Sequence, residues 1–190
     1  MGLFGIKTRH EKVLESVNKQ IQETKEFVNK IKKEKNLTSI NTRIILKPNE
    51  EAFLQTDSVL LEGRSTTYYK GSSLGGGFRV TKGVYVGGSS RSGKSESKQE
   101  LKEIDRGHLV LTNQKLVFTG TQENRNVPLK KIIAFESHSD AILITVENKV
   151  KKMYFTVPNS GIWYFVFQIL LQSPNPHKLG DINSSVSVED

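Results

Sequence analysis

The stretch "GHLVLTNQKLVFTG", residues 107–120, is the clearest structural signal in this 190-residue chain. Two apolar runs, Leu109–Leu111 and Leu116–Phe118, flank the polar segment 112–115. Asparagine tolerates the left-handed backbone that a tight turn needs, so Asn113 suits a connection between antiparallel strands. The stretch therefore predicts a β-hairpin.

Further β-prone segments lie on both sides of this hairpin, separated by turn residues such as Pro48, Gly83 and Asn148. Asn148 supplies the turn of a second hairpin, while Gly83 interrupts a strand. Six to eight short strands are expected in all, within the 107–120 hairpin and residues 43–65, 66–71, 78–88, 126–137, 140–148 and 149–158. Their order along the chain predicts an antiparallel sheet with one face or end to be covered.

The segment "GIWYFVFQILL", residues 161–171, predicts the helix that covers this sheet. Asn159 or Ser160 can cap its first turn, and the two following prolines end it. A membrane span needs roughly 20 apolar residues, so this run is too short. Its aromatic residues, Trp163 among them, are expected in the core rather than as a base-stacking platform.

Four stretches together resemble bacterial pleckstrin-homology-like and GRAM-like domains. They are "LKPNEEAFL" (46–54), the 107–120 hairpin, "VPLKKI" (127–132) and "YFTVPNSGIWYFVFQIL" (154–170). The resemblance covers roughly residues 44–172. It implies a mainly β (α+β) fold, an antiparallel barrel capped by a C-terminal helix. It also implies a non-catalytic binding module for lipid headgroups, peptides or proteins, and it assigns no particular binding residue here.

A long amphipathic, basic helix is predicted over residues 8–36, ahead of this domain, because proline and glycine are absent and Glu, Lys and Gln are frequent. Its apolar positions form a heptad pattern, which predicts either packing along the domain or weak self-association. The pattern comprises Leu14, Val17, Ile21, Thr24, Val28 and Ile31. The predicted organisation is a helix and linker (1–42), a pleckstrin-homology-like domain (43–172) and a disordered tail (173–190).

Composition excludes several kinds of site. The chain has no cysteine, which rules out disulfides, thiolate metal ligands and a cysteine nucleophile. The four histidines, His10, His108, His138 and His177, are far apart in sequence, so neither a metal nor another cofactor is expected. The N-terminal decapeptide has too short an apolar run for a signal peptide, which predicts a cytoplasmic protein.

One motif points to nucleotide chemistry. Residues 88–95, "GSSRSGKS", match the spacing of a phosphate-binding loop, in which a strand precedes the loop and a helix follows it. A strand at residues 84–86 and a helix after Lys94 are both conceivable. The strands predicted downstream do not suit the alternating α/β sheet of nucleotide hydrolases. Nucleotide binding is therefore kept as the alternative function.

The same region is basic and rich in glycine, which predicts a loop that gathers anions through its cations and backbone N–H groups. A plain surface loop without a ligand is the other interpretation. The candidate anion-binding residues are Lys70, Arg79, Lys82, Arg91, Lys94 and Lys98.

The net charge of +8 has two interpretations. Basic surfaces attract anionic lipid, acidic proteins or nucleic acid, which would make the partner acidic, but many small domains carry a charge of this size without a polyanion partner. Residues 1–47 alone carry eleven Lys/Arg against five Asp/Glu. The predicted function is non-catalytic binding or scaffolding, with a protein or an anionic membrane surface as partner. Peripheral association with the inner membrane face is the membrane version of this prediction, and nucleic-acid binding is a further, disfavoured alternative. Self-association would use Leu14, Val17, Ile21, Val28 and Ile31.

Overall fold

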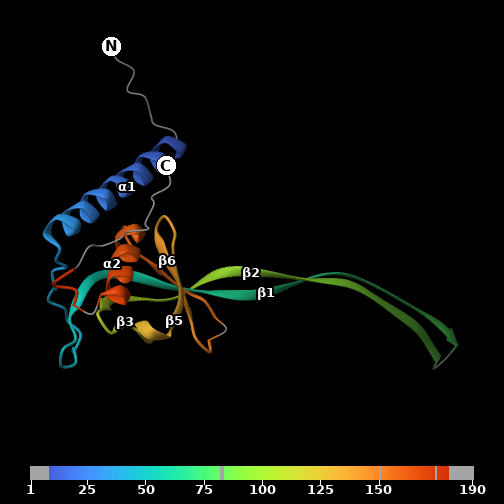
Figure 1. The fold of residues 1–190 in the computed structure, drawn as a ribbon. Helices are drawn as coiled ribbons and strands as arrows, with labels where there is room; N and C mark the ends of the chain where they lie inside the picture. The colour runs from blue at the N-terminus through green and yellow to red at the C-terminus, as the bar shows by residue number, and fades with distance from the viewer. Residues whose placement is uncertain (1–8, 82–83, 150, 174, 180–190) are drawn as a thin grey trace, which may run out of the picture. The chain divides into compact units, whose positions relative to one another are not determined.

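The computed structural model describes residues 9–81, 84–149, 151–173 and 175–179 (Figure 1). In chain order the elements are α1 (Arg9–Glu34), β1 (Ala52–Thr81), β2 (Val84–Thr112), β3 (Lys115–Gly120), β4 (Asn124–Pro128), the 3-10 turn η1 (Leu129–Lys131), β5 (Ile132–Ser137), β6 (Ala141–Val146), β7 (Met153–Thr156) and α2 (Ser160–Gln172). The chain is therefore mainly antiparallel β with one helix before the strands and one after them, which is the α+β class predicted.

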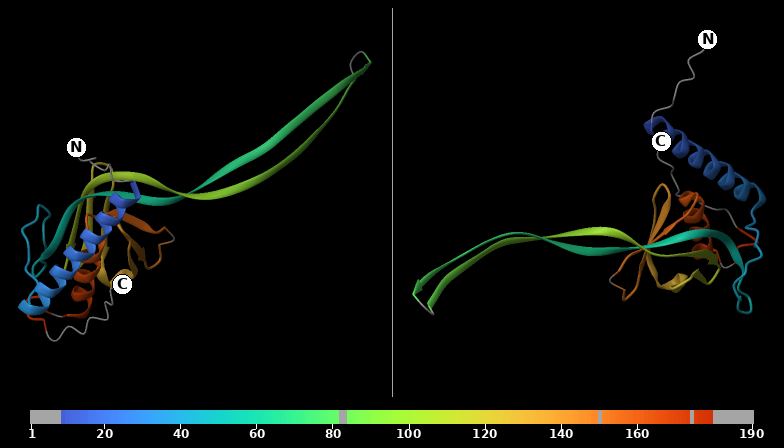
Figure 2. Two further views of the ribbon diagram at one scale, coloured as in Figure 1. Left: turned by 90° about the horizontal axis from the view of Figure 1, so that it is seen from above. Right: turned by 180° about the vertical axis from the view of Figure 1, so that it is seen from behind.

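Two compact units make up the chain, and each is described by itself. The first, called the body, comprises the residues up to 62 and from 103 onward. The second, called the basic hairpin, is residues 63–102, formed by the later part of β1 and the earlier part of β2. These two strands run side by side in every view (Figures 1 and 2).

The strands form one sheet in the order β4-β3-β2-β1-β7-β6-β5. The first strand pairs antiparallel with the last, with Leu60 opposite Phe155. Among the described residues β4 and β5 are the two edge strands of the sheet. The 3-10 turn η1 connects them along the chain. The sheet order is therefore open.

Both predicted hairpins are confirmed. In the 107–120 stretch Leu109 lies opposite Phe118, and Leu111 opposite Leu116. In the second hairpin β6 pairs with β7, and Asn148 in the connection has a left-handed backbone with φ of 59°. Both connections contain an asparagine: the Asn113 side chain forms hydrogen bonds at the first turn, and Asn148 adopts the left-handed backbone of the second.

The strand predicted on both sides of Pro48 begins only at Ala52, so the first half of that prediction is wrong. The preceding residues form a turn in which the Glu50 N–H donates to the Lys47 carbonyl at 3.0 Å. Asn49 has a left-handed backbone there, with φ of 61°. Proline fixes its own φ, which suits a turn of this kind better than a strand.

Helix α2 supplies much of the core. Asn159 caps it, as predicted, by accepting a hydrogen bond from the Ile162 N–H at 3.3 Å. Trp163, Phe165 and Phe167 are each at most 3% exposed, which confirms the core interpretation. The helix packs against β5 and β6, and against α1 on another side (Figure 1).

Helix α1 packs against α2 through its second half. The rings of Phe27 and Phe165 meet edge-on at 6.3 Å, and Ile31 is 4% exposed. By contrast, Val13 and Leu14 near the helix start are about half exposed. The apolar pattern of α1 is therefore covered toward its C-terminal end and open toward its N-terminal end.

The C-terminal tail, predicted to be disordered, is ordered over residues 175–179. The Leu179 N–H donates to the Lys35 carbonyl, and the Leu37 N–H donates to the Pro176 carbonyl, each at 2.9 Å. Leu179 is 4% exposed, so an apolar anchor and two backbone hydrogen bonds hold this segment. The remaining tail lies outside the described residues.

A buried carboxylate joins the segment 46–54 to the 107–120 hairpin. Glu50, 4% exposed, accepts hydrogen bonds from the Thr112 hydroxyl at 2.8 Å and from the Lys47 N–H at 3.0 Å. The Lys115 ammonium lies 3.2 Å from its second oxygen. Burial raises the pKa of Glu50, but these donors and the Lys115 charge lower it by more, so the pKa lies below its usual value.

A second carboxylate, Asp105 on β2, holds the connection between β3 and β4. Its oxygens accept hydrogen bonds from the Gln122 N–H, the Thr121 hydroxyl and the Glu123 N–H, at 2.7, 2.7 and 2.8 Å. These hydrogen bonds, the one from Gln122 foremost, hold the pKa of Asp105 well below its usual range. A Cβ on Gly120 would lie 2.2 Å from the carboxylate, so the connection also requires that glycine.

The low pKa of Asp105 predicts a loss of stability in acid. The folded protein keeps this carboxylate ionised where the unfolded chain takes up a proton, so the contribution is full above about pH 4, the ordinary value for aspartate, and falls as pH drops below it. Asp105→Asn should lower the urea midpoint at pH 7 and flatten its decline between pH 4 and pH 2, relative to wild type. The exposed Asp140→Asn serves as control, and equal pH profiles for the two variants would contradict the assignment.

Candidate functional site

Five of the six predicted anion-binding residues lie on extended backbone rather than in a loop. Threonine, tyrosine and valine flank the glycines, and these β-prone residues allow the pairing of β1 and β2 to run through the Gly-rich stretch. The expected break at Gly83 falls between the two strands and, with Lys82, lies outside the described residues. The five described residues are Lys70 and Arg79 in β1, and Arg91, Lys94 and Lys98 in β2.

The basic hairpin carries a large share of the positive charge. Residues 63–102 contain eight Lys/Arg and two Asp/Glu, a net +6 out of the +8 of the whole chain. Residues 1–47 have an equal excess, but five glutamates are interspersed among its basic residues. The basic hairpin is therefore the more uniformly cationic of the two regions.

The phosphate-loop match at residues 88–95 lies within β2, which continues unbroken to Thr112. The helix considered after Lys94 is strand instead, so that interpretation is wrong. A phosphate-binding loop needs a turn and a helix N-terminus to direct its N–H groups at the phosphates. Extended backbone directs N–H groups to alternate sides, so this segment lacks the geometry of such a loop.

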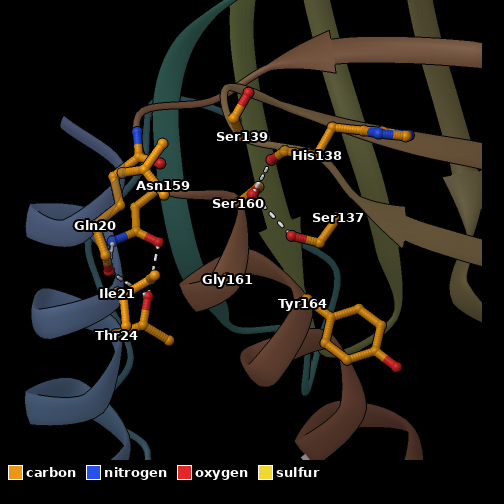
Figure 3. Close-up of a pocket in the computed structure, with 11 residues that line it drawn as sticks. Gln20, Ile21, Thr24, Ser137, His138, Ser139, Asn159, Ser160, Gly161 and Tyr164 are labelled. Atoms are coloured by element: carbon orange, nitrogen blue, oxygen red, sulfur yellow. Dashed lines mark hydrogen bonds between the residues drawn. The ribbon is translucent and has the colours of Figure 1, made fainter. Parts of the chain in front are cut away.

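The body contains a cavity of about 330 Å³ between α1 and the start of α2 (Figure 3). Val17 and Ile21 of α1 line one side, and Gly161 and Tyr164 of α2 line the other. The turn before β6, residues 137–139, completes the wall. This volume is at the lower end of the range for small-ligand pockets.

A polar contact holds the two helices together at one wall of the cavity (Figure 3). Asn159, 7% exposed, accepts a hydrogen bond from the Thr24 hydroxyl at 2.9 Å and donates to the Gln20 carbonyl at 3.1 Å. A Cβ on Gly161 would lie 2.9 Å from the Thr24 oxygen, so the helices approach closely here. The cap of α2 is thus also its attachment to α1.

A hydroxyl chain forms the opposite wall. Ser137 donates to the Ser160 hydroxyl at 2.7 Å, and Ser160 in turn donates to the His138 carbonyl. Both hydroxyl protons are used inside the protein, so these serines stabilise the turn before β6. In these contacts neither serine hydroxyl donates to a side chain that could act as a general base, which a nucleophilic serine requires.

Sequence spacing did not reveal two histidine–carboxylate pairs. His108 Nδ1 lies 2.6 Å from an Asp57 oxygen, and His177 Nε2 contacts Glu51. The partners are 51 and 126 residues apart, so no local pattern joins them. Both pairs lie at the surface, and the described residues contain no group of three or more His, Asp or Glu arranged to hold a metal.

An ionic cluster at β1 and β4 is a further feature that sequence spacing did not reveal. Arg125 donates to Glu62 at 3.1 Å and to Glu123 at 2.6 Å, and Lys151 lies 3.7 Å from Glu62. Glu62 is 7% exposed, so its charge requires these cations. The cluster thus links the strands, and both carboxylates are paired with cations.

Comparisons of the chain with protein-family models, with curated proteins and with solved structures each found no match. Within the described part of the chain, neither helix combines the length and apolar character needed to cross a bilayer. Function is therefore inferred from the residues themselves. In the described part of the chain, the basic hairpin and the cavity beside α1 are the candidate ligand-binding features.

Asn159→Ala should destabilise the body by about 2–3 kcal/mol, because it removes a helix cap and the two hydrogen bonds that join Asn159 to the Thr24 hydroxyl and the Gln20 carbonyl of α1. Urea unfolding at pH 7 measures the change. Asn126→Ala, at an exposed strand position, is the matched control and should stay within about 0.5 kcal/mol of wild type. A similar small change in both variants would show that Asn159 does not join the helices.

Proposed function

We propose that this chain is a non-catalytic binding module with a pleckstrin-homology-like body, and that its basic hairpin binds an anionic membrane surface. The charge of the hairpin carries the proposal, at net +6 over residues 63–102. The proposed location is the cytoplasm, at the inner face of the membrane.

The arrangement of the body supports the pleckstrin-homology-like assignment. Seven antiparallel strands precede one C-terminal helix, and that helix packs against β5 and β6. The first and last strands pair, as Leu60 and Phe155 illustrate. Folds of one class carry many different functions, so the ligand must be argued from the basic hairpin itself.

The composition of the basic hairpin supports a membrane partner. A two-stranded hairpin alone is at best marginally stable in water. Residues 68–86 combine tyrosine, phenylalanine, valine and leucine with lysine and arginine. An anionic bilayer interface suits this mixture, because lipid headgroups attract the cations while aromatic and apolar side chains enter the interfacial region.

A vesicle flotation experiment tests the proposal. The wild-type chain should bind vesicles of phosphatidylcholine with phosphatidylglycerol, bind phosphatidylcholine alone far less, and lose affinity as salt rises. Removing four hairpin charges should weaken binding about 100-fold or more, since each basic residue near the surface contributes about 1 kcal/mol. The variant combines Arg79→Gln, Arg91→Gln, Lys94→Gln and Lys98→Gln.

A control variant removes the same number of charges from exposed positions of the body. It combines Lys32→Gln, Lys33→Gln, Lys130→Gln and Lys152→Gln. This control should retain most of the wild-type affinity. Equal losses in the two variants would show that only total charge matters, and no vesicle binding at low salt would contradict a membrane partner.

A further inference from the structure

The N-terminal half of α1 presents apolar side chains that the described part of the body does not cover. Val13 is 54% exposed, Leu14 48% and Ile21 36%. Further along the same helix, Thr24 is 9% exposed and Ile31 4%. The apolar stripe therefore continues past the region where α2 covers it.

The cavity lies directly beside this uncovered part. Val17 and Ile21 belong both to the apolar pattern of α1 and to the cavity wall. Figure 3 shows Ile21 and Tyr164 on opposite sides of the cavity. The close approach of Gly161 to Thr24 narrows the space between the helices at that point. What remains is an apolar groove lined by Val17, Ile21 and Tyr164, and the exposed Val13 lies one helical turn before Val17 on the same face of α1.

The chain itself contains a segment that suits this groove. Residues 1–6, "MGLFGI", lie two residues before α1 and outside the described residues, and their side chains carry no charge. We propose that this segment folds back along α1 and that Phe4 occupies the cavity. The inference goes beyond the proposed function and does not depend on the basic hairpin.

Distance permits this docking. At 1.5 Å of rise per helical residue, Val17 lies about 12 Å along the axis from Arg9. Five extended residues from Arg9 back to Phe4 span about 16 Å, at 3.3 Å each. Gly5 adopts backbone conformations that let the chain reverse sharply between Phe4 and the helix.

A second copy of the chain suits the groove less well. The half-exposed side chains offer on the order of 200 Å² of apolar surface, against about 800 Å² per partner in a stable interface. A segment of the same chain needs less area, because its docking does not lose the translational freedom of a second molecule. A membrane surface is also disfavoured, since Glu11, Glu15 and Glu23 are interspersed with the lysines of this half of α1.

The absence of cysteine makes the segment easy to label in the full chain. A nitroxide attached through Gly2→Cys should broaden the NMR signals of Val17, Ile21 and Tyr164 strongly. Adding Phe4→Ser should restore most of that intensity. Asn126, at an exposed position of the edge strand β4 in the body, is the reference position and should keep its intensity throughout.

Mixing spin-labelled chain with unlabelled, isotope-enriched chain separates the two possible sources of the segment. Broadening that disappears in this mixture supports docking within one chain, whereas broadening that persists would assign the groove to a second copy and overturn the proposal. No broadening of the groove residues would overturn it as well. In hydrogen exchange, Phe4→Ser should also speed the α1 amides near Val17 by about 10-fold, as expected when a buried aromatic is lost.

Discussion

The carboxylate of Glu50 is the constraint on which the rest of the body depends. A buried charge is tolerated only when it is hydrogen-bonded and paired, and Glu50 obtains both from Thr112 and Lys115. Those residues stand at the two ends of the β2–β3 turn. The segment that opens the sheet and the hairpin at its centre must therefore fold together.

Backbone hydrogen bonds extend this connection. The Glu51 N–H donates to the Asn113 side chain, the Asn113 N–H donates back to the Glu51 carbonyl, and the Leu129 N–H donates to the Gln114 carbonyl. Three of the four stretches that resemble pleckstrin-homology-like domains thus meet at one place. The Glu50, Thr112-Asn113 and Lys115 side chains in these stretches make contacts that hold the fold.

Much of the body follows from local patterns. The 107–120 hairpin and α2 were predictable because turn residues and apolar periodicity lie within a few residues of each other. The strands expected at residues 66–71 and 78–88 are part of the basic hairpin, but the continuation of β2 through residues 88–102 was not predictable, because glycine-rich composition indicates a loop unless pairing between distant residues is known. The cavity was not predictable either, since Asn159 and Thr24 are 135 residues apart.

The two units therefore have different proposed roles: the body holds the fold, and the basic hairpin binds the anionic surface. Fold-determining contacts concentrate in the body, where polar networks at Glu50, Asp105 and Asn159 fix turns and helix ends. The basic hairpin contributes positive charge and aromatic residues, with a net charge of +6 over residues 63–102. Sequence composition pointed to that candidate site, while the extended backbone of residues 88–102 became evident only in the structure.

A double-mutant cycle on Glu50 and Lys115, measured by urea unfolding, tests the central constraint most directly. Glu50→Gln and Lys115→Met should each cost about 3 kcal/mol, because each leaves a buried charge without its partner. The double variant should cost at least about 1.5 kcal/mol less than the sum of the two single changes. Additivity within about 0.5 kcal/mol would contradict the account, because the two residues would then contribute independently.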